Sequence, residues 1–203
     1  MGRPRSISDD DIARAARACL EEHGPRVATA VIAERLGVSQ AALFKRLGTR
    51  EAILTASLAT VAPPTWREAL AAGPPAEGAA DALEELLVAM YTSLRELLPL
   101  LLLLTSAGLP LSELPLPSLR AAPHEARRGL ARWLRAARAR GALPARPEED
   151  VADVLVAALE ARCFREHLGG RAFAPGSAAT YVRSLLGAVG LTPPPRERKE
   201  KGA

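Results

Sequence analysis

The sequence predicts an all-α protein that consists of a small N-terminal helical domain and a larger C-terminal one. Apolar residues recur at spacings of three and four along most of the 203-residue chain, and the apolar–polar alternation of strands is nearly absent. Helix caps and Gly or Pro stops divide these segments into about nine helices. A content of 48% hydrophobic and 25% charged residues is typical of a folded, soluble protein.

Four short helices are predicted before Pro63-Pro64. The first three follow residues whose side chains can cap a helix, which are Ser8, Thr29 and Ser39. Gly24-Pro25 is expected to end the first helix, Gly37 the second, and the fourth helix is expected to start after Gly48-Thr49. The fourth helix is expected to run on to the two prolines.

Longer helices are predicted beyond that point, separated by Pro and Gly. Their expected ranges are 65–72, 77–98, 100–107, 124–140, 148–168 and 176–189. Four prolines make 108–123 a predicted loop or broken helix. We therefore expect domains at 1–61 and 62–192, and a disordered basic tail at 193–203.

The basic residues point to a polyanionic partner for the N-terminal domain. The net charge is +4, and the stretch 36–50 contains Lys45, Arg46 and Arg50 without any acid. Arg3 and Arg5 precede the first acidic residues. An ordinary solvated surface is the alternative for so few cations, unless a motif accompanies them.

Composition also disfavours several other classes. With 3% aromatic residues, the chain is a poor match for proteins that bind by aromatic stacking. Cys19 and Cys163 have no metal-binding spacing and fit a reducing cytoplasm, where we expect the protein. No signal peptide is recognisable, and Pro99 makes the apolar run 97–104 too short for a membrane span, so no membrane partner is expected.

Ala33, Gly37 and Leu43 stand at the spacing of a helix-turn-helix. A small residue lets two helices cross closely, glycine tolerates the sharp turn, and the leucine anchors the second helix on the first. The third helix then opens with the small or polar residues 39–42, which could approach base edges. The motif favours DNA binding over a merely solvated surface.

Residues 37–54, GVSQAALFKRLGTREAIL, resemble the GVS-x-x-x-LY-x-x-F-x-x-KE-x-L signature of TetR family transcriptional regulators. The resemblance covers about the first sixty residues. It implies an N-terminal DNA-binding domain, a divergent helical domain that dimerises and binds an effector, and a function that is usually repression. The function implied is ligand-responsive regulation of transcription, with release from the operator by a small, mainly apolar effector.

The resemblance and helix geometry together assign roles in the DNA-binding domain. Gln40 and Ala41, with Ser39 and Ala42 near them, are predicted to meet major-groove base edges, with Gln40 directed toward adenine. Arg3 and Arg5 could enter the minor groove or stay inert. The predicted DNA-binding residues are Arg3, Arg5, Thr29, Ser39, Gln40, Ala41, Ala42, Phe44, Lys45, Arg46, Thr49 and Arg50.

Three positions depart from the family signature. Phe44 lacks the tyrosine hydroxyl that would reach a phosphate, and the usual Thr-Thr pair is reduced to Ala28-Thr29. Arg50 stands where the family usually has lysine, so the positive charge is kept. We expect phosphate contacts to shift toward Arg46.

One such domain reads few base pairs, so we expect a homodimer on a palindromic operator, with recognition helices about 34 Å apart. The last two long helices carry apolar stripes that a two-fold partner could complete as a four-helix bundle. The alternative is that both stripes only cover their own core. The predicted interface consists of Val151, Val154, Leu155, Ala158, Leu159, Tyr181, Leu185, Leu186 and Val189.

An effector pocket is predicted among the central helices, where the scarce aromatic residues gather. Its candidate residues are Trp66, Met90, Tyr91, Leu94, Leu98, Leu101, Leu102, Thr105, Trp133 and Phe164. Plain core packing is the alternative for most of them. The arginines at 127–140 could bind an anion, although a solvated helix face is the preferred interpretation.

Glu160, Cys163 and His167 share a helix face and could in principle bind zinc or form a catalytic pair. They lack an orienting partner in the sequence, and known catalytic motifs are absent. We therefore expect neither an enzyme nor a bound metal or cofactor. The remaining alternative is a helical ligand-binding protein that does not bind DNA sequence-specifically.

Overall fold

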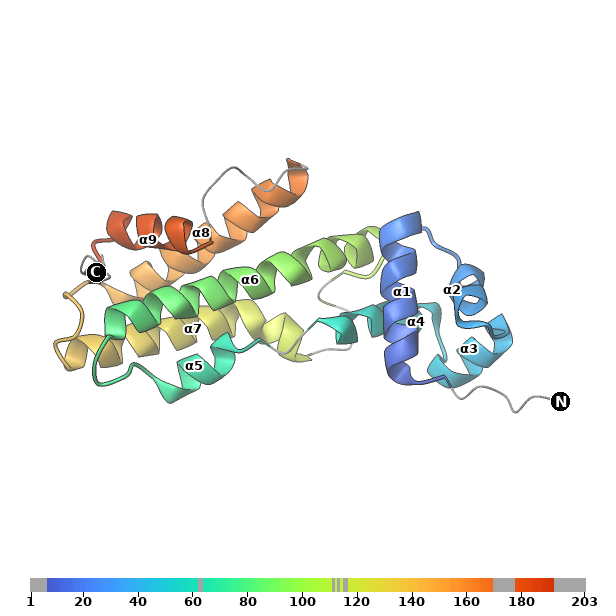
Figure 1. Cartoon of the computed structure of the whole chain (residues 1–203), viewed down its shortest axis with the longest axis horizontal. Helices are drawn as coiled ribbons and strands as arrows, with labels where there is room; N and C mark the ends of the chain where they lie inside the picture. Colours follow the sequence, from blue (N-terminus) through green and yellow to red (C-terminus); the bar gives the residue numbers. More distant parts are fainter. Residues whose placement is uncertain are drawn as a thin grey trace, which may run out of the picture. The chain divides into compact units, whose positions relative to one another are not determined.

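A computed structural model describes residues 7–61, 64–110, 112, 114, 117–169 and 178–191, with the backbone alone at 117–120. Within these residues the chain is entirely helical, and the predicted all-α class is confirmed (Figure 1). The helices are α1 (Asp9–His23), α2 (Thr29–Leu36), α3 (Gln40–Leu47), α4 (Arg50–Thr55), the 3₁₀-helix η1 (Ala56–Thr60), α5 (Trp66–Ala72), α6 (Ala79–Ser106), α7 (Pro117–Ala139), α8 (Glu148–Leu168) and α9 (Ala178–Ala188).

The chain forms two compact units, each built from two separate stretches of the sequence. The first unit spans 1–63 and 93–121, and the second spans 64–92 and 122–203. α6 contributes its N-terminal half to the second unit and its C-terminal half to the first. The predicted domain 62–192 does not include this division, in which 93–121 groups with the N-terminal helices.

In the first unit, α1 packs against α2, α4 and η1, and α3 contacts α2 and α4. Ile12, Leu20 and Ile32 are completely buried at the centre of this cluster. Leu100 and Leu104 of α6 are buried in the same cluster. Because burial of a leucine contributes about 1.5–3 kcal/mol, the α6 leucines are an integral part of this core.

A capping box fixes the start of α1. The Ser8 hydroxyl accepts a hydrogen bond from the Asp11 N–H (3.1 Å), and the Ser8 N–H donates to the Asp11 carboxylate (3.0 Å). The Ser8 hydroxyl also donates to this carboxylate (2.6 Å). These bonds from Ser8, and a further one from Arg14, lower the pKa of Asp11 to about 2.

The turn between α2 and α3 has the geometry that the sequence predicts. Gly37 adopts φ 70° and ψ 30°, in the left-handed region, and its N–H bonds the carbonyls of Ala33 and Glu34. The next N–H, of Val38, donates to the Ala33 carbonyl at 3.0 Å. These three bonds end α2 at the turn that leads into α3.

Several predicted helix bounds were wrong. α6 continues through Pro99, which the sequence analysis treated as a break, because buried leucines on both sides hold the helix together despite the missing N–H. α7 begins at Pro117 instead of 124, and residues after Thr55 tighten into η1. The cap of α2 is Ala28, whose backbone is extended, and Thr29 is the first helical residue.

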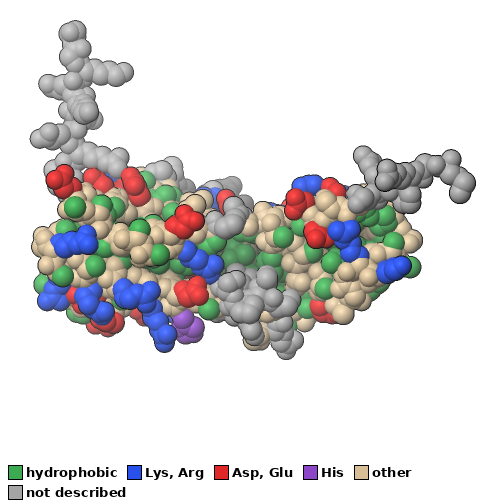
Figure 2. Space-filling view, turned by 90° about the horizontal axis from the view of Figure 1, so that it is seen from below, with side chains coloured by type: hydrophobic (Ala, Val, Ile, Leu, Met, Phe, Trp, Pro, Cys, Tyr) green, Lys and Arg blue, Asp and Glu red, His purple; other side chains and the backbone are tan. Residues whose placement is uncertain are grey.

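Salt bridges line the contact between α7 and α8 in the second unit. Arg127 lies 2.9 Å from Asp153, Arg138 lies 2.8 Å from Glu148, and Arg135 pairs with Glu149. Figure 2 shows basic and acidic side chains interspersed on the face it displays. These pairings support the interpretation of the α7 arginines as a solvated face.

By length and composition, α6 could cross a membrane, and it is the one helix among the described residues that passes this test. Such a helix is weak evidence, since a core helix of a soluble protein passes too. Pro99 does not interrupt this helix, so the prediction of an apolar run too short for a membrane span was wrong. Leu83, Leu87 and Leu104 of α6 are fully buried and buried Glu84 is ion-paired with Arg183, but only 28% of the helix's most apolar window is buried within the chain.

We predict that Asp11→Asn weakens the acid dependence of stability. The lowered pKa stabilises the folded state fully above the ordinary carboxyl value of about 3.9, and this contribution is lost as the pH falls toward 2. Thermal melts between pH 5 and pH 2 measure it. Asp10→Asn, in the same exposed first turn, is the matched control, and an equal change in both variants would contradict the prediction.

We predict that Gly37→Ala destabilises the first unit by about 1–2 kcal/mol, because alanine is strained at φ 70°. Gly37→Asn should lose less, since asparagine tolerates this conformation. Urea unfolding followed by circular dichroism compares the two variants. Equal losses would show that the backbone conformation is not the cause.

Candidate nucleic-acid interface

The first turn of α3 is exposed. Ser39, Gln40, Ala41 and Ala42 all lie at the surface, whereas Leu43 is buried in the core of the first unit. The Ser39 hydroxyl accepts a hydrogen bond from the Ala42 N–H at 3.1 Å and thereby caps the helix. The first turn of α3 therefore presents small and polar side chains to solvent, while Leu43 holds the helix in the core.

Gln40 is tied to the preceding helix. Its side-chain Nε2 donates to the Thr29 hydroxyl at 2.7 Å. Gln40 itself is exposed, but Thr29 is only 6% exposed. Thr29, predicted as a phosphate contact, is thus placed beneath the predicted base-reading residue.

Two cations at the end of α3 have different surroundings. Arg46 lies 2.7 Å from the Asp9 carboxylate and donates to the Ile7 carbonyl at 2.5 Å, so it links α3 to the start of α1. Lys45 is exposed, and within the described part of the chain it has no ion pair. Lys45 is accordingly the cation of this helix most available to a polyanion.

Thr49, Arg50 and Phe44 hold the domain together. Thr49 caps α4 by accepting from the Ala52 N–H (3.1 Å). Arg50 donates to the carbonyls of Pro25 (3.2 Å) and Ala107 (3.4 Å). Phe44 is half-buried against the core cluster. Contacts of these three residues with phosphates remain predictions.

The start of α2 lacks a side-chain cap and has no acid in its first turn, unlike α1. Its first amides can therefore serve a phosphate oxygen. Arg26, which the sequence analysis did not single out, is exposed in the loop just before this end. The signal that could have identified Arg26 is its position two residues before Ala28, which has no side chain to cap the helix that follows. Arg3 and Arg5 lie outside the described residues.

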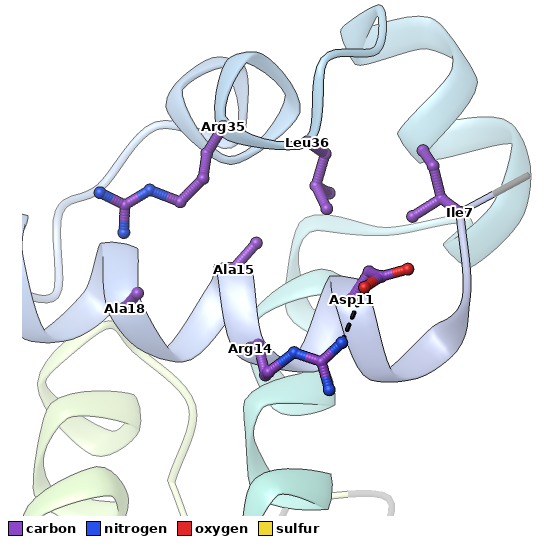
Figure 3. Close-up of a pocket in the computed structure, with 7 residues that line it drawn as sticks. All are labelled: Ile7, Asp11, Arg14, Ala15, Ala18, Arg35 and Leu36. Carbon is purple, nitrogen blue, oxygen red and sulfur yellow. Dashed lines mark hydrogen bonds and ion pairs between the residues drawn. The ribbon is translucent and has the colours of Figure 1, made fainter. Parts of the chain in front are cut away.

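A hollow of about 480 Å³ lies between α1 and α2 in the same unit (Figure 3). Arg14 and Arg35 border it, together with apolar residues such as Ile7 and Leu36. Arg14 pairs with Asp11 at 2.7 Å, and Arg35 pairs with Glu22. No lining residue comes from α3, so this hollow is separate from the exposed turn.

The predicted effector residues fall into both units. Trp66, Met90, Tyr91 and Trp133 are buried in the second unit, and Phe164 is 45% exposed. The other five, Leu94, Leu98, Leu101, Leu102 and Thr105, belong to the part of α6 in the first unit. Thr105 is exposed, and Leu101 packs against the core of that unit. Their role in one pocket stays a prediction.

Tyr91 belongs to a polar cluster in the second unit. Its hydroxyl donates to the Glu166 carboxylate at 2.5 Å, and Arg162 donates to the same oxygen at 2.8 Å. The Arg162 guanidinium also lies 4.4 Å from the centre of the Tyr181 ring. Burial, and next the bond to Glu166, raise the pKa of Tyr91 to about 12. The cluster ties α6, α8 and α9 together.

The predicted dimer residues divide into buried and exposed groups. Val151, Leu155, Leu159 and Leu186 are buried within their own chain, so their side chains are unavailable to a partner. Val154 is 51% exposed, and Ala158, Tyr181, Leu185 and Val189 are partly exposed. Exposed apolar residues also continue along one face of α8. This exposed stripe consists of Val154, Ala157, Ala161, Phe164 and Leu168.

The three residues considered for metal or catalysis do not converge. Glu160 pairs with Arg127 at 3.3 Å, and the buried Cys163 thiol points to the Tyr91 carbonyl at 3.8 Å. Within the described ranges, no group of three or more His, Cys, Asp or Glu side chains is placed to hold a metal ion.

Comparisons with known proteins agree with this architecture. Residues 12–56 match the family described as bacterial regulatory proteins, tetR family. No curated protein matches the sequence.

Solved structures share the fold over nearly the whole chain. A cysteine mutant of the TetR family transcriptional regulator CifR, complexed with 26-bp double-strand operator DNA, is 21% identical, with a TM-score of 0.64 over 93% of this chain and 100% of that one. GusR of Salmonella enterica is 22% identical (TM-score 0.58, 90% and 95% covered). PfmR, a TetR family regulator of Thermus thermophilus, is 20% identical (TM-score 0.58, 88% and 96% covered).

The resemblance found in the sequence is thereby confirmed. Residues 12–56 of this chain match the model of the tetR family of bacterial regulatory proteins, and the chain has the fold of solved TetR-family regulators.

Proposed function

We propose that this protein is a homodimeric transcriptional regulator that binds a palindromic double-stranded operator and is released from it by a small, mainly apolar effector. The observation that carries the proposal is the exposed leading turn of α3, residues 39–42, on a helix whose Leu43 is buried. A capped helix end with small side chains fits the width of a major groove. The operator DNA in the complex of CifR supports it by analogy of fold.

Phosphate and base contacts fall to different parts of this surface. The start of α2, which lacks a side-chain cap, and the exposed cations Arg26 and Lys45 are suited to phosphates, which fix the position of the domain. Gln40 and the methyl groups of Ala41 and Ala42 are suited to base edges. Arg46 is already bonded to the Asp9 carboxylate and the Ile7 carbonyl, so a phosphate would compete with these acceptors for its guanidinium.

The exposed stripe of α8 supports a dimer formed through the last two helices. Its apolar residues would remain in water in a monomer, and a two-fold partner would bury them. Two domains would then present their α3 helices about 34 Å apart, one turn of the duplex. A protein that binds chromosomal DNA in this way would act in the cytoplasm.

α6 offers a physical route from effector to operator. It supplies buried residues to both units, Leu83 and Leu87 to the second and Leu100 and Leu104 to the first. A ligand that binds one conformation of the second unit more tightly would shift the population of conformations. Repression, relieved by the ligand, is the proposed consequence.

We predict that Lys45→Ala weakens operator binding and lowers the salt dependence of affinity. Each phosphate contact contributes about 0.9 to the slope of log K against log salt, so a dimer that loses two contacts should lose about two units of slope. Gel-shift titrations use the DNA beside the coding sequence at several salt concentrations. Arg132→Ala, an exposed cation on α7, is the charge-matched control.

An unchanged slope for Lys45→Ala would remove this residue from the interface. Absence of any specific binding by the unaltered chain would instead favour the alternative, a helical ligand-binding protein without sequence-specific DNA binding. The two outcomes are separated by competition with unrelated DNA.

We predict that Val154→Glu converts the dimer to a monomer, because a charge would enter the centre of an apolar interface. Val154 is 51% exposed in the single chain, so the fold itself should tolerate the change. Sedimentation equilibrium measures the mass. Thr92→Glu, at an exposed position of α6, is the control, and a dimeric Val154→Glu protein would exclude this stripe as the interface.

A further inference from the structure

The bond between Thr29 and Gln40 bears on how the protein distinguishes bases. We propose that Thr29 is a positioning residue that orients the Gln40 amide toward adenine and against guanine, instead of contacting a phosphate itself. The inference rests on the proposed function, since it concerns base reading by the first turn of α3.

The geometry places the two side chains in different layers of the surface. Thr29, the first helical residue of α2, is 6% exposed, whereas Gln40, the first residue of α3, is exposed. The Thr29 hydroxyl accepts the Gln40 Nε2–H at 2.7 Å, a short distance for such a bond. Because Thr29 is nearly buried, little of the residue is open to a phosphate oxygen; the bond from Gln40 uses a lone pair of the hydroxyl and leaves its O–H as a donor.

This bond changes what Gln40 can offer to DNA. A free glutamine amide has two N–H donors and one carbonyl acceptor. With one N–H used by Thr29, one donor and one acceptor remain. Adenine presents an acceptor (N7) and a donor (N6–H) in the major groove, which matches this pair, whereas guanine presents two acceptors (N7 and O6).

Loss of the Thr29 hydroxyl should therefore relax a specific discrimination. The amide would regain its second N–H and its rotational freedom, so it could donate to guanine as well as pair with adenine. A phosphate contact, in contrast, carries no sequence information, and its loss would weaken all operators alike. The two roles thus predict different patterns of affinity.

The experiment measures binding of the full-length protein to its operator and to operators in which each base pair of the half-site is replaced in turn. The variants are Thr29→Val, Thr29→Ser, Gln40→Ala and the double variant Thr29→Val/Gln40→Ala. Thr29→Val keeps the branched shape and removes the hydroxyl, whereas Thr29→Ser keeps the hydroxyl. Thr55→Val is the matched control, because Thr55 is another nearly buried helical threonine in the same unit, bonded to the Glu51 carbonyl.

We expect Thr29→Val to lose about tenfold in its preference for A·T over G·C at one position of each half-site. Thr29→Ser should retain the preference, and Thr55→Val should match the unaltered protein. In the Gln40→Ala background, removal of the Thr29 hydroxyl should have no further effect, since a residue that acts through Gln40 has nothing left to orient. Circular dichroism confirms folding of each variant, and Thr29→Ala, which also lacks the hydroxyl, takes the place of Thr29→Val in both backgrounds if Thr29→Val does not fold.

Two results would overturn the inference. An equal loss of affinity for all operators in Thr29→Val, or an unchanged effect of that substitution in the Gln40→Ala background, would assign Thr29 to a phosphate. Both leave the proposed function intact, because sequence-specific binding by the unaltered protein is measured first. Absence of that binding would overturn the proposed function together with this inference.

Discussion

The close crossing of α2 and α3 is the constraint on which the candidate interface depends. Gly37 at φ 70° permits the turn, small and buried Ala33 permits close approach, and Leu43 anchors α3 from beneath. Because Leu43 holds the inner face of α3 in the core, residues 39–42 at its start remain exposed. Gln40 and Thr29 meet across the same crossing, so the geometry that exposes the turn also orients its polar side chain.

Three cations that are close in sequence, Lys45, Arg46 and Arg50, have different interaction partners in the fold. In sequence, Lys45, Arg46 and Arg50 form one basic stretch without acids. In the fold, Arg46 is paired with Asp9, Arg50 bonds two backbone carbonyls, and Lys45 remains exposed. An ion pair at the surface contributes little to stability, so the Asp9 pairing is an exchangeable contact, whereas the half-buried bonds of Arg50 serve the structure.

α6 belongs to both units, because its N-terminal half lies in the second unit and its C-terminal half in the first. Its length and composition pass a simple test for a membrane helix, while several of its leucines are buried and its buried Glu84 pairs with Arg183. The sequence predicts a break at Pro99, because a proline has no backbone N–H and removes one hydrogen bond of the helix. Buried leucines on both sides of Pro99 compensate for that lost hydrogen bond and keep the helix continuous.

The sequence by itself determined the all-α class, the helix-turn-helix and the exposed polar start of α3, because caps, glycines and apolar spacing act over a few neighbouring residues. Only the tertiary structure decided which side of α8 is covered, where α6 packs, and that Thr29 lies under Gln40 instead of capping α2. Those outcomes depend on contacts between residues far apart in the chain, and local patterns do not encode which partner a given side chain will meet.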